Sequence, residues 1–289
     1  MSLMRRNEHL LVSRSRRRRL VDALVYLICS VLIVIFIFPT LWMVSTSLKS
    51  VAQIYKVPLI WIPRPPAWSN YINALQAMPF EKYVRNSLFI VVTVTLGTVL
   101  SSSFVAYGFA RFRAPGREIL FMIVLSTMML PYAVTLIPQF IMFSKMQWIN
   151  TYRPLTIPAY LGSPFFIFLL RQFFMTIPRE LDEAAKMDGC SALGILLRII
   201  LPLSKPALVT VVVFSAIWTW NDFLGPLVYL SSKDKFTVAV GLSFFRGEHS
   251  TDWGMLMAAS TMATIPSLIV FLLAQRYFVQ GIATSGLKG

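Results

Sequence analysis

Six long stretches that are almost free of charge constrain this chain more than any other feature. They are Ala23–Val44, Ser87–Ala110, Ile119–Ser144, Pro154–Leu170, Ala207–Leu230, which contains one acid, and Trp253–Gln275. A helix needs about 20 residues, each rising 1.5 Å, to cross a hydrocarbon core of about 30 Å, and only the fourth stretch is marginal. The sequence therefore predicts an all-α polytopic membrane protein with six transmembrane helices.

Composition supports this class and argues against an active site. Only 13% of the residues are charged, whereas soluble proteins carry about 25%. The two cysteines, Cys29 and Cys190, provide no disulfide framework, and the two histidines, His9 and His249, lie far apart. We therefore expect no metal site and no catalytic residue.

The basic residues predict the orientation of the chain in the membrane. Seven of the 27 lie in a tail over residues 1–20: Arg5, Arg6, Arg14, Arg16, Arg17, Arg18 and Arg19. Such a run beside a spanning segment is typical of a cytoplasmic anchor that contacts membrane lipid. We therefore expect no nucleic acid partner. With this tail inside, the inner segments carry 17 basic residues and the outer segments 10. We expect both termini to be cytoplasmic.

The third inner connection, Arg171–Pro206, contains an unusual cluster of acids. Glu180, Asp182, Glu183 and Asp188 fall within nine residues. Pro178 suits the first turn of a short helix, the early acids complement its dipole, and Gly189 can provide a left-handed stop. Ser191 can then cap a second short helix.

On the first of these helices, Leu181, Ala184 and Ala185 share one face at positions i, i+3 and i+4, flanked by Glu180 and Glu183. The alanines leave room for the backbone of another protein. Two interpretations stay open at this point: a solvated amphipathic loop, or a docking element for a cytoplasmic partner.

Several motifs resemble a known family. Glu183-Ala184-Ala185, Asp188-Gly189 and Leu201-Pro202-Leu203 resemble the EAA loop of binding-protein-dependent ABC importer permeases. Two further segments resemble the carbohydrate-importer subfamily, specifically its six-span, maltose-type second permease: Trp220-Asn221-Asp222-Phe223-Leu224 and Gln275-Arg276-Tyr277-Phe278-Val279-Gln280-Gly281. The resemblance covers essentially all of the chain beyond the arginine-rich tail.

The resemblance implies a type I ABC importer permease fold over residues 21–280, with the EAA loop at 171–206. It implies that Pro178–Met187 is a coupling helix in a groove of a nucleotide-binding subunit, and that the tail over residues 281–289 approaches the ATPase dimer. The residues implied to couple to the ATPase are Glu180, Leu181, Glu183, Ala184, Ala185, Asp188 and Gly189.

The same resemblance implies the partners and the compartment. The partners are a second permease subunit, two ATPase subunits and an external solute-binding protein, which would dock on outer loops 46–86 and 231–252. The compartment is the bacterial plasma membrane. Because the chain has no phosphate-binding loop of its own, ATP and magnesium would be bound by the ATPase subunits.

Asp222 is the one acid well inside a predicted span, where a carboxylate should face other helices or water. Asn221 and Asp222 could bind a sugar or polyol, with Trp218 and Trp220 as flat apolar surfaces. The alternative is an internal hydrogen-bond lock beside Pro226.

The main rival function is an ion-driven secondary transporter, which would normally show coupling-ion ligands and an inverted repeat at membrane depth. A membrane-embedded enzyme is a further alternative, disfavoured because no paired acids or histidines lie near one interface. The sequence does not identify the solute.

Overall fold

The computed structural model describes residues 2–245 and 251–285, with side chains described over residues 21–245 and 251–275. The side chains of the arginine-rich tail, His249 in the second outer loop, and residues 286–289 of the predicted C-terminal tail therefore lie outside the described part.

Every regular element in the described residues is helical. In chain order these are α1 (Ser2–Ser47), α2 (Val51–Ile54), α3 (Ser69–Ala77), α4 (Phe80–Arg111), α5 (Arg117–Ser126), η1 (Thr127–Met129), α6 (Tyr132–Lys145), α7 (Arg153–Thr156), η2 (Ile157–Leu161), α8 (Pro164–Thr176), α9 (Glu180–Met187), α10 (Ala192–Ile195), η3 (Leu196–Ile200), α11 (Leu201–Leu203), α12 (Lys205–Trp220), α13 (Leu224–Tyr229), η4 (Lys233–Lys235), α14 (Val238–Ser243) and α15 (Trp253–Ser285).

Four helical segments of this set are long and apolar enough to cross a membrane: Val21–Ser47, Phe80–Arg111, Arg153–Thr176 and Trp253–Gln275. Two more qualify only as bent pairs: Arg117–Met129 with Tyr132–Lys145, and Ala192–Leu203 with Lys205–Trp220. The described chain thus holds up to six spans, and the predicted fold class is confirmed.

The third and fifth spans are broken by bends. The third bends by 96° between its two parts. Leu130 and Pro131 are extended there, as expected for a proline and the residue before it. The fifth stops at Trp220 and resumes at Leu224.

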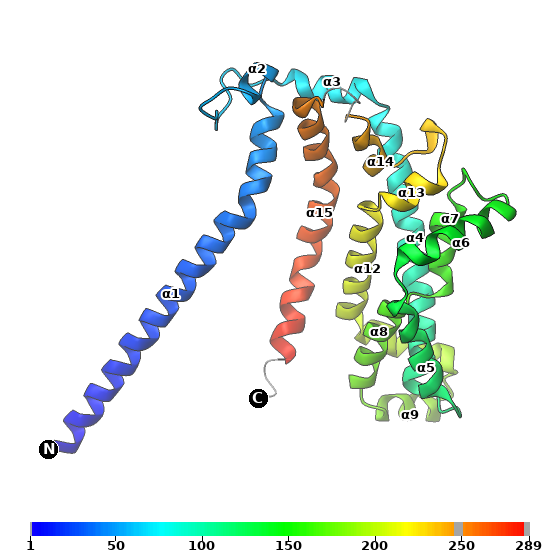
Figure 1. Ribbon diagram of the computed structural model, residues 1–289. Helices are drawn as coiled ribbons and strands as arrows, with labels where there is room; N and C mark the ends of the chain where they lie inside the picture. The colour runs from blue at the N-terminus through cyan, green and yellow to red at the C-terminus, as the bar shows by residue number, and fades with distance from the viewer. Residues whose placement is uncertain (1, 246–250, 286–289) are drawn as a thin grey trace.

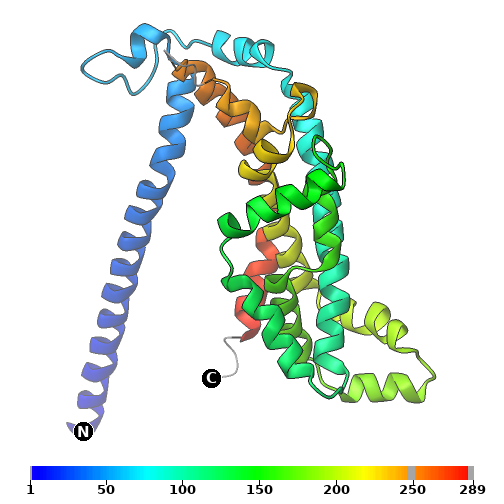
Figure 2. The same ribbon diagram turned by 45° about the vertical axis from the view of Figure 1, so that its right-hand side comes forward.

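The helices form a bundle from which α1 diverges (Figure 1). Helices α4, α8 and α12 pack together, whereas α1 leans away and meets α15 near the end that carries α2 and α3. We call that end the outer end, and the opposite end, which carries α9, the inner end. The first turn of α1 and the last described turn of α15 both lie toward the inner end, as the second view also shows (Figure 2).

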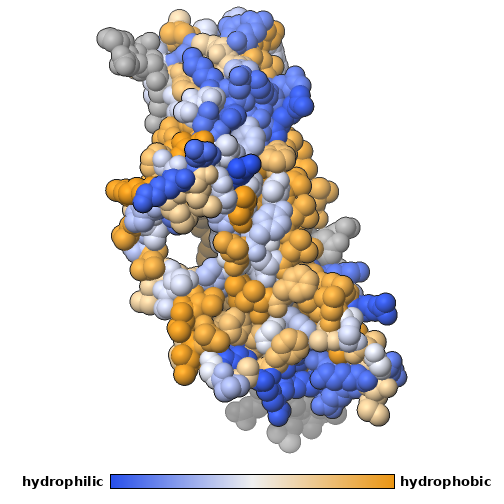
Figure 3. Space-filling view, turned by 90° about the vertical axis from the view of Figure 1, so that its right-hand side faces the viewer, coloured by the Kyte–Doolittle hydropathy of each residue, from blue (hydrophilic) through white to orange (hydrophobic). Residues whose placement is uncertain are grey.

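The surface follows the same axis. On the face shown in Figure 3, hydrophilic side chains gather toward the two ends, and hydrophobic side chains cover much of the surface between them. Such an apolar band between polar ends is the surface expected of a chain that spans a bilayer.

Helix α4 passes through both hydrophobic cores of the bundle. Ala106, Tyr107 and Ala110 join the inner core, and Tyr83 joins the outer core. Between them the helix buries small and hydroxylated residues, including Thr98 and Ser102. Small residues let neighbouring helices approach closely. The polar stretch of this span therefore serves helix packing.

Candidate functional site

Helix α9 is a short, exposed rod at the inner end. It begins at Glu180, two residues later than expected, and ends at Met187. Three acids lie in its first turn and Lys186 in its last, so both ends carry charges that the helix dipole favours. Of the nine residues 180–188, seven are exposed, and only Asp182 and Ala185 are buried.

The helix ends in the way that the sequence predicts. Gly189 has φ +79°, in the left-handed region. Its amide donates to the Lys186 carbonyl at 3.0 Å, and the Cys190 amide donates to the Ala185 carbonyl at 2.9 Å. This pair of bonds is a Schellman motif, which satisfies carbonyls that the helix itself leaves free. The chain turns sharply there, and nothing lies within 4 Å of the place where a Cβ on Gly189 would stand.

The second short helix also follows the prediction. Ser191 caps α10, because its hydroxyl accepts a hydrogen bond from the Gly194 amide at 3.2 Å. A π-helical turn, η3, continues the chain, and its Leu196 and Ile200 are fully buried. Buried apolar residues therefore fix α10 and η3 to the inner core, while α9 projects beyond them.

The predicted docking face of α9 needs a correction. Leu181 and Ala184 are exposed, but Ala185 is only 6% exposed and belongs to the inner core. Ala185 lies one turn after Asp182, on the side of the helix that faces the bundle. The exposed face is therefore formed by Leu181 and Ala184 with the carboxylates of Glu180, Glu183 and Asp188.

A buried ion pair joins α9 to α4. The Nε atom of Arg111, the last residue of α4, lies 3.1 Å from Oδ2 of Asp182, and the two side chains are 4% and 10% exposed. Neither Oδ1 of Asp182 nor Nε of Arg111 has a hydrogen-bond partner among the described residues, so the two side chains form an ion pair and not a hydrogen bond. The Arg111 Nη2 atom also donates to the Ile177 carbonyl at 2.9 Å. Arg111 therefore contacts the chain both before and within α9.

A second ion pair lies nearby and leaves α9 untouched. Arg171 on α8 donates from Nη2 to both carboxylate oxygens of Glu118, at 3.0 and 2.9 Å, and from Nε to the Phe109 carbonyl at 3.3 Å. This pair connects α8 with the inner ends of α4 and α5.

The structure divides the four predicted solute-pathway residues. Trp218 and Asp222 line a cavity of about 270 Å³, and Trp220 and Asn221 line a different one of about 370 Å³. Trp220 is 7% exposed, and its indole nitrogen donates to the Ala263 carbonyl at 3.0 Å, so the side chain fastens α12 to α15.

Asp222 has a clear structural partner. Its Oδ1 atom accepts a hydrogen bond from the Gly225 amide at 3.1 Å, where α13 begins. Asn221 donates from Nδ2 to the Ile217 carbonyl at 2.8 Å, at the end of α12. Both side chains therefore bond backbone groups at the helix break, which favours the lock beside Pro226 over a sugar-binding pair.

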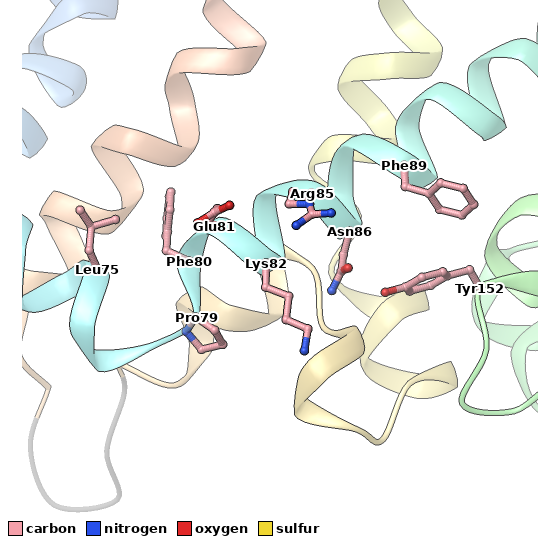
Figure 4. A pocket seen from close by; sticks show the side chains of 9 residues that line it. All are labelled: Leu75, Pro79, Phe80, Glu81, Lys82, Arg85, Asn86, Phe89 and Tyr152. Carbon is pink, nitrogen blue, oxygen red and sulfur yellow. The ribbon is translucent and has the colours of Figure 1, made fainter.

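A groove opens at the outer end of α4 (Figure 4). It has a volume of about 930 Å³ and is lined by Leu75, Pro79, Phe80, Glu81, Lys82, Arg85, Asn86, Phe89 and Tyr152. Lys82 Nζ lies 2.6 Å from Asp234, and Asn86 Nδ2 donates to the Asp234 and Phe236 carbonyls. The rings of Phe89 and Tyr152 lie 5.6 Å apart. The groove thus lies in the first predicted outer loop and the start of α4, and two of its lining residues, Lys82 and Asn86, connect it to the second outer loop.

Sequence reasoning missed the roles of Arg111, Arg171 and Tyr152. The two arginines counted only toward the orientation of the chain, and nothing in the local pattern marks Tyr152 as a neighbour of Phe89. Asp182 was read as a complement to the helix dipole. Its spacing of three from Ala185 was the available signal that it faces inward.

Comparisons with known proteins agree with this architecture. A family model described as "Binding-protein-dependent transport system inner membrane component" matches residues 97–284. The probable ABC transporter permease protein YurM of Bacillus subtilis is 33% identical, over 98% of this chain and 95% of that protein. The trehalose/maltose transport system permease protein MalG of Thermococcus litoralis is 35% identical, over 89% and 93%.

A solved structure is also similar. It is the crystal structure of a bacterial ABC transporter involved in the import of the acidic polysaccharide alginate, with 26% identity and a TM-score of 0.77 over 90% of this chain and 97% of that one.

Proposed function

We infer that this chain, which belongs to the family of binding-protein-dependent transport system inner membrane components, is the membrane-spanning permease subunit of an ATP-driven importer for a sugar or related polyhydroxy solute. It is a non-catalytic subunit. The Thermococcus relative is named for the transport of trehalose and maltose, and the similar solved structure for the import of the polysaccharide alginate, which supports a carbohydrate solute and gives the ion-coupled alternative no support.

The observation that carries the coupling mechanism is the exposed face of α9. A rigid helix that projects from the inner end, with Leu181 and Ala184 beside three carboxylates, has the shape and charge to fit a groove with basic residues. We propose that this groove belongs to an ATPase subunit. The coupling residues are then Glu180, Leu181, Glu183, Ala184, Asp188 and Gly189, while Ala185 supports the helix from behind.

The remaining partners follow from the same architecture. Two ATPase subunits bind ATP and magnesium, and a second permease completes the solute pathway. The groove of Figure 4 receives the external solute-binding protein. We propose that the inner end faces the cytoplasm of a bacterium and that both termini lie on that side; the first described turn of α1 and the last described turn of α15, which lie toward α9, support this orientation.

The experiment is reconstitution of the complex in lipid vesicles, with the second permease, ATPase and binding protein encoded beside this chain. Wild-type complex should import solute only with ATP inside and binding protein outside. Glu183→Lys reverses a charge on the exposed face, and Gly189→Val puts a branched residue at φ +79°. Both should lower ATPase co-purification or uptake.

A matched control is Asp22→Lys, which reverses an exposed acid on α1, outside the coupling loop. It should leave uptake and ATPase binding unchanged. Normal ATPase binding and normal uptake in both loop variants would remove α9 from the mechanism. Uptake by the purified chain alone, driven by an ion gradient, would favour the rival class.

A further inference from the structure

We propose that Arg111 and Asp182 are positioning residues that make α9 and α4 one rigid body, so that a displacement of the coupling helix reaches the outer groove without loss. The inference rests on the proposed function, because it assigns a mechanical connection to a permease that is driven through α9.

Helix α9 needs such a connection because little else holds it. Among its eight residues, only Asp182 and Ala185 are buried. Ala185 offers one methyl group to the inner core, and a small contact of this kind lets a helix roll. The buried ion pair with Arg111 is therefore the main side-chain contact that fixes the helix against the bundle.

Arg111 fixes orientation as well as position. Its Nε atom lies 3.1 Å from Asp182, inside the first turn of α9, and its Nη2 atom donates to the Ile177 carbonyl, before the helix begins. One planar guanidinium thus makes a hydrogen bond to the chain before α9 and an ion pair with a carboxylate inside it, which limits how α9 can turn against α4. Lysine has a single ammonium on a flexible stem and cannot hold both points with the same geometry.

Burial also favours a positional role. A buried ion pair often stabilises a protein no more than an apolar pair of the same volume, because removing two charges from water is costly. What such a pair provides is a defined geometry, since each partner is left unpaired in any other arrangement.

Helix α4 can transmit a movement over the whole height of the molecule. It has 32 residues, which corresponds to a length of about 48 Å. Both α1 and α15 contain an internal proline, at Pro39 and Pro266, whereas α4 contains none. Its backbone ladder therefore lacks the interruption that a proline causes.

The outer end of α4 is attached to the second outer loop by hydrogen bonds, as its inner end is attached to α9 by the ion pair. Asn86 donates to the carbonyls of Asp234 and Phe236, and the Ser87 hydroxyl accepts from the Val238 amide at 3.0 Å. The same turns of α4 line the groove (Figure 4). One helix therefore joins the proposed ATPase contact to the proposed binding-protein contact.

The first test measures coupling in the reconstituted complex. In Asp182→Asn the side chain keeps its volume and loses its charge. The exposed face of α9 is unchanged, so ATPase subunits should still assemble and hydrolyse ATP. The ATP consumed per solute imported should rise at least about fivefold, the lower end of typical coupling between sites. Arg111→Lys, which keeps the charge and loses the second contact, should give an intermediate ratio.

The matched control is Glu118→Gln, which breaks the neighbouring ion pair with Arg171 but touches no residue of α9. It should keep the wild-type ratio. The proposal is overturned if Asp182→Asn and Arg111→Lys also keep that ratio, or if Glu118→Gln raises it as much as they do.

The second test measures the rigid connection directly and does not depend on transport. Spin labels at Lys186→Cys on α9 and Leu100→Cys on α4 are placed in a Cys29→Ser, Cys190→Ser background of this chain, within the complex. Leu100 lies about 16 Å along α4 from Arg111, and both labelled side chains are exposed. Wild type should give one narrow distance distribution that is the same with and without ATP, and Asp182→Asn should broaden it.

A wild-type distance that changes on ATP binding, or a narrow distribution in Asp182→Asn, would overturn the proposal. If no ATPase associates with the chain, the proposed function fails. The label distances in wild type and Asp182→Asn then still decide whether the ion pair holds α9 to α4.

Discussion

Replacement of Asp222 separates a structural role from a solute-binding role. In the structure the Oδ1 atom of Asp222 accepts a hydrogen bond from the Gly225 amide at 3.1 Å, so the side chain, one residue before Phe223 at the start of α13, satisfies an amide of the first turn as a capping side chain does. Asp222→Ala removes this acceptor, whereas Asp222→Asn keeps a carbonyl oxygen in the same place. The two variants therefore differ in the cap and share the loss of the charge.

The magnitude follows from the single bond that is lost. Removing a capping side chain costs about 0.5–2 kcal/mol, typically ~1 kcal/mol. In a chain of this size, 1 kcal/mol lowers a melting midpoint by about 2–4 °C. Exchange of aspartate for asparagine at a cap changes stability little, because both are preferred there. We expect Asp222→Ala to melt about 2–4 °C below wild type, and Asp222→Asn to melt close to wild type.

The assay combines thermal unfolding of the purified complex with the solute dependence of uptake. If Asp222 is a cap, the half-saturating solute concentration should stay the same in both variants that fold. Asn221→Ala serves as a neighbouring control, because Asn221 bonds the Ile217 carbonyl on the other side of the break. Unchanged melting in Asp222→Ala, together with a raised half-saturating concentration in both variants, would refute the reasoning and make Asp222 a solute ligand.

Two further predictions concern packing. A Cβ on Gly241 would stand 2.5 Å from the ring of Tyr83, which is 2% exposed and cannot move away, so Gly241→Ala should destabilise the complex by about 1–3 kcal/mol in thermal unfolding. Gly108→Ala meets nothing within 4 Å and, as its control, should be neutral or slightly stabilising. Trp220→Phe removes the bond to the Ala263 carbonyl and should cost about 0.5–1.5 kcal/mol without a change in half-saturating solute concentration; a changed concentration would place Trp220 in the pathway.

Local chemistry was readable from the sequence where the cause of the structure is itself local. The stop at Gly189 depends on a glycine that tolerates a positive φ, and the cap at Ser191 depends on a hydroxyl three residues before an amide. The apolar stretches were recognised because the length of a span is set by the bilayer. Each of these features is determined within about 20 residues of sequence.

The pairing of Arg111 with Asp182 could not be read in the same way. The two residues belong to segments that meet only when α4 and α8 pack, and the charge of each had a sufficient local explanation. The spacing of three residues between Asp182 and Ala185 is a weak signal that Asp182 faces the bundle, and no such signal exists for Arg111. The separation of Trp218 from Trp220 likewise depends on which side of α12 faces α15, and the apolar pattern of that helix is too uniform to indicate a side.

The role of Asp222 depends on where the helix of the fifth span ends. Within a continuous fifth span the carboxylate would need a partner on another helix or a solute. Because the helix stops at Trp220 and resumes at Leu224, the partner is the amide three residues later. The signal was present as an aspartate followed at that spacing by Gly225 and then Pro226, an arrangement typical of a new helix start.

The positions of the breaks bear on how the bundle can move. If α9 and α4 turn as one body, the change in orientation has to be absorbed in the segments that pack against α4. The structure provides interruptions there: the 96° bend near Pro131, the 81° bend at Ser204, and the break between Trp220 and Leu224. Hinges are typically a few residues at the ends of helices. A continuous helix beside broken neighbours is therefore the arrangement expected of a rigid transmitting element. The spin-label pair on Lys186 and Leu100 should report no change on ATP binding, whereas labels placed across Ser204 should report one.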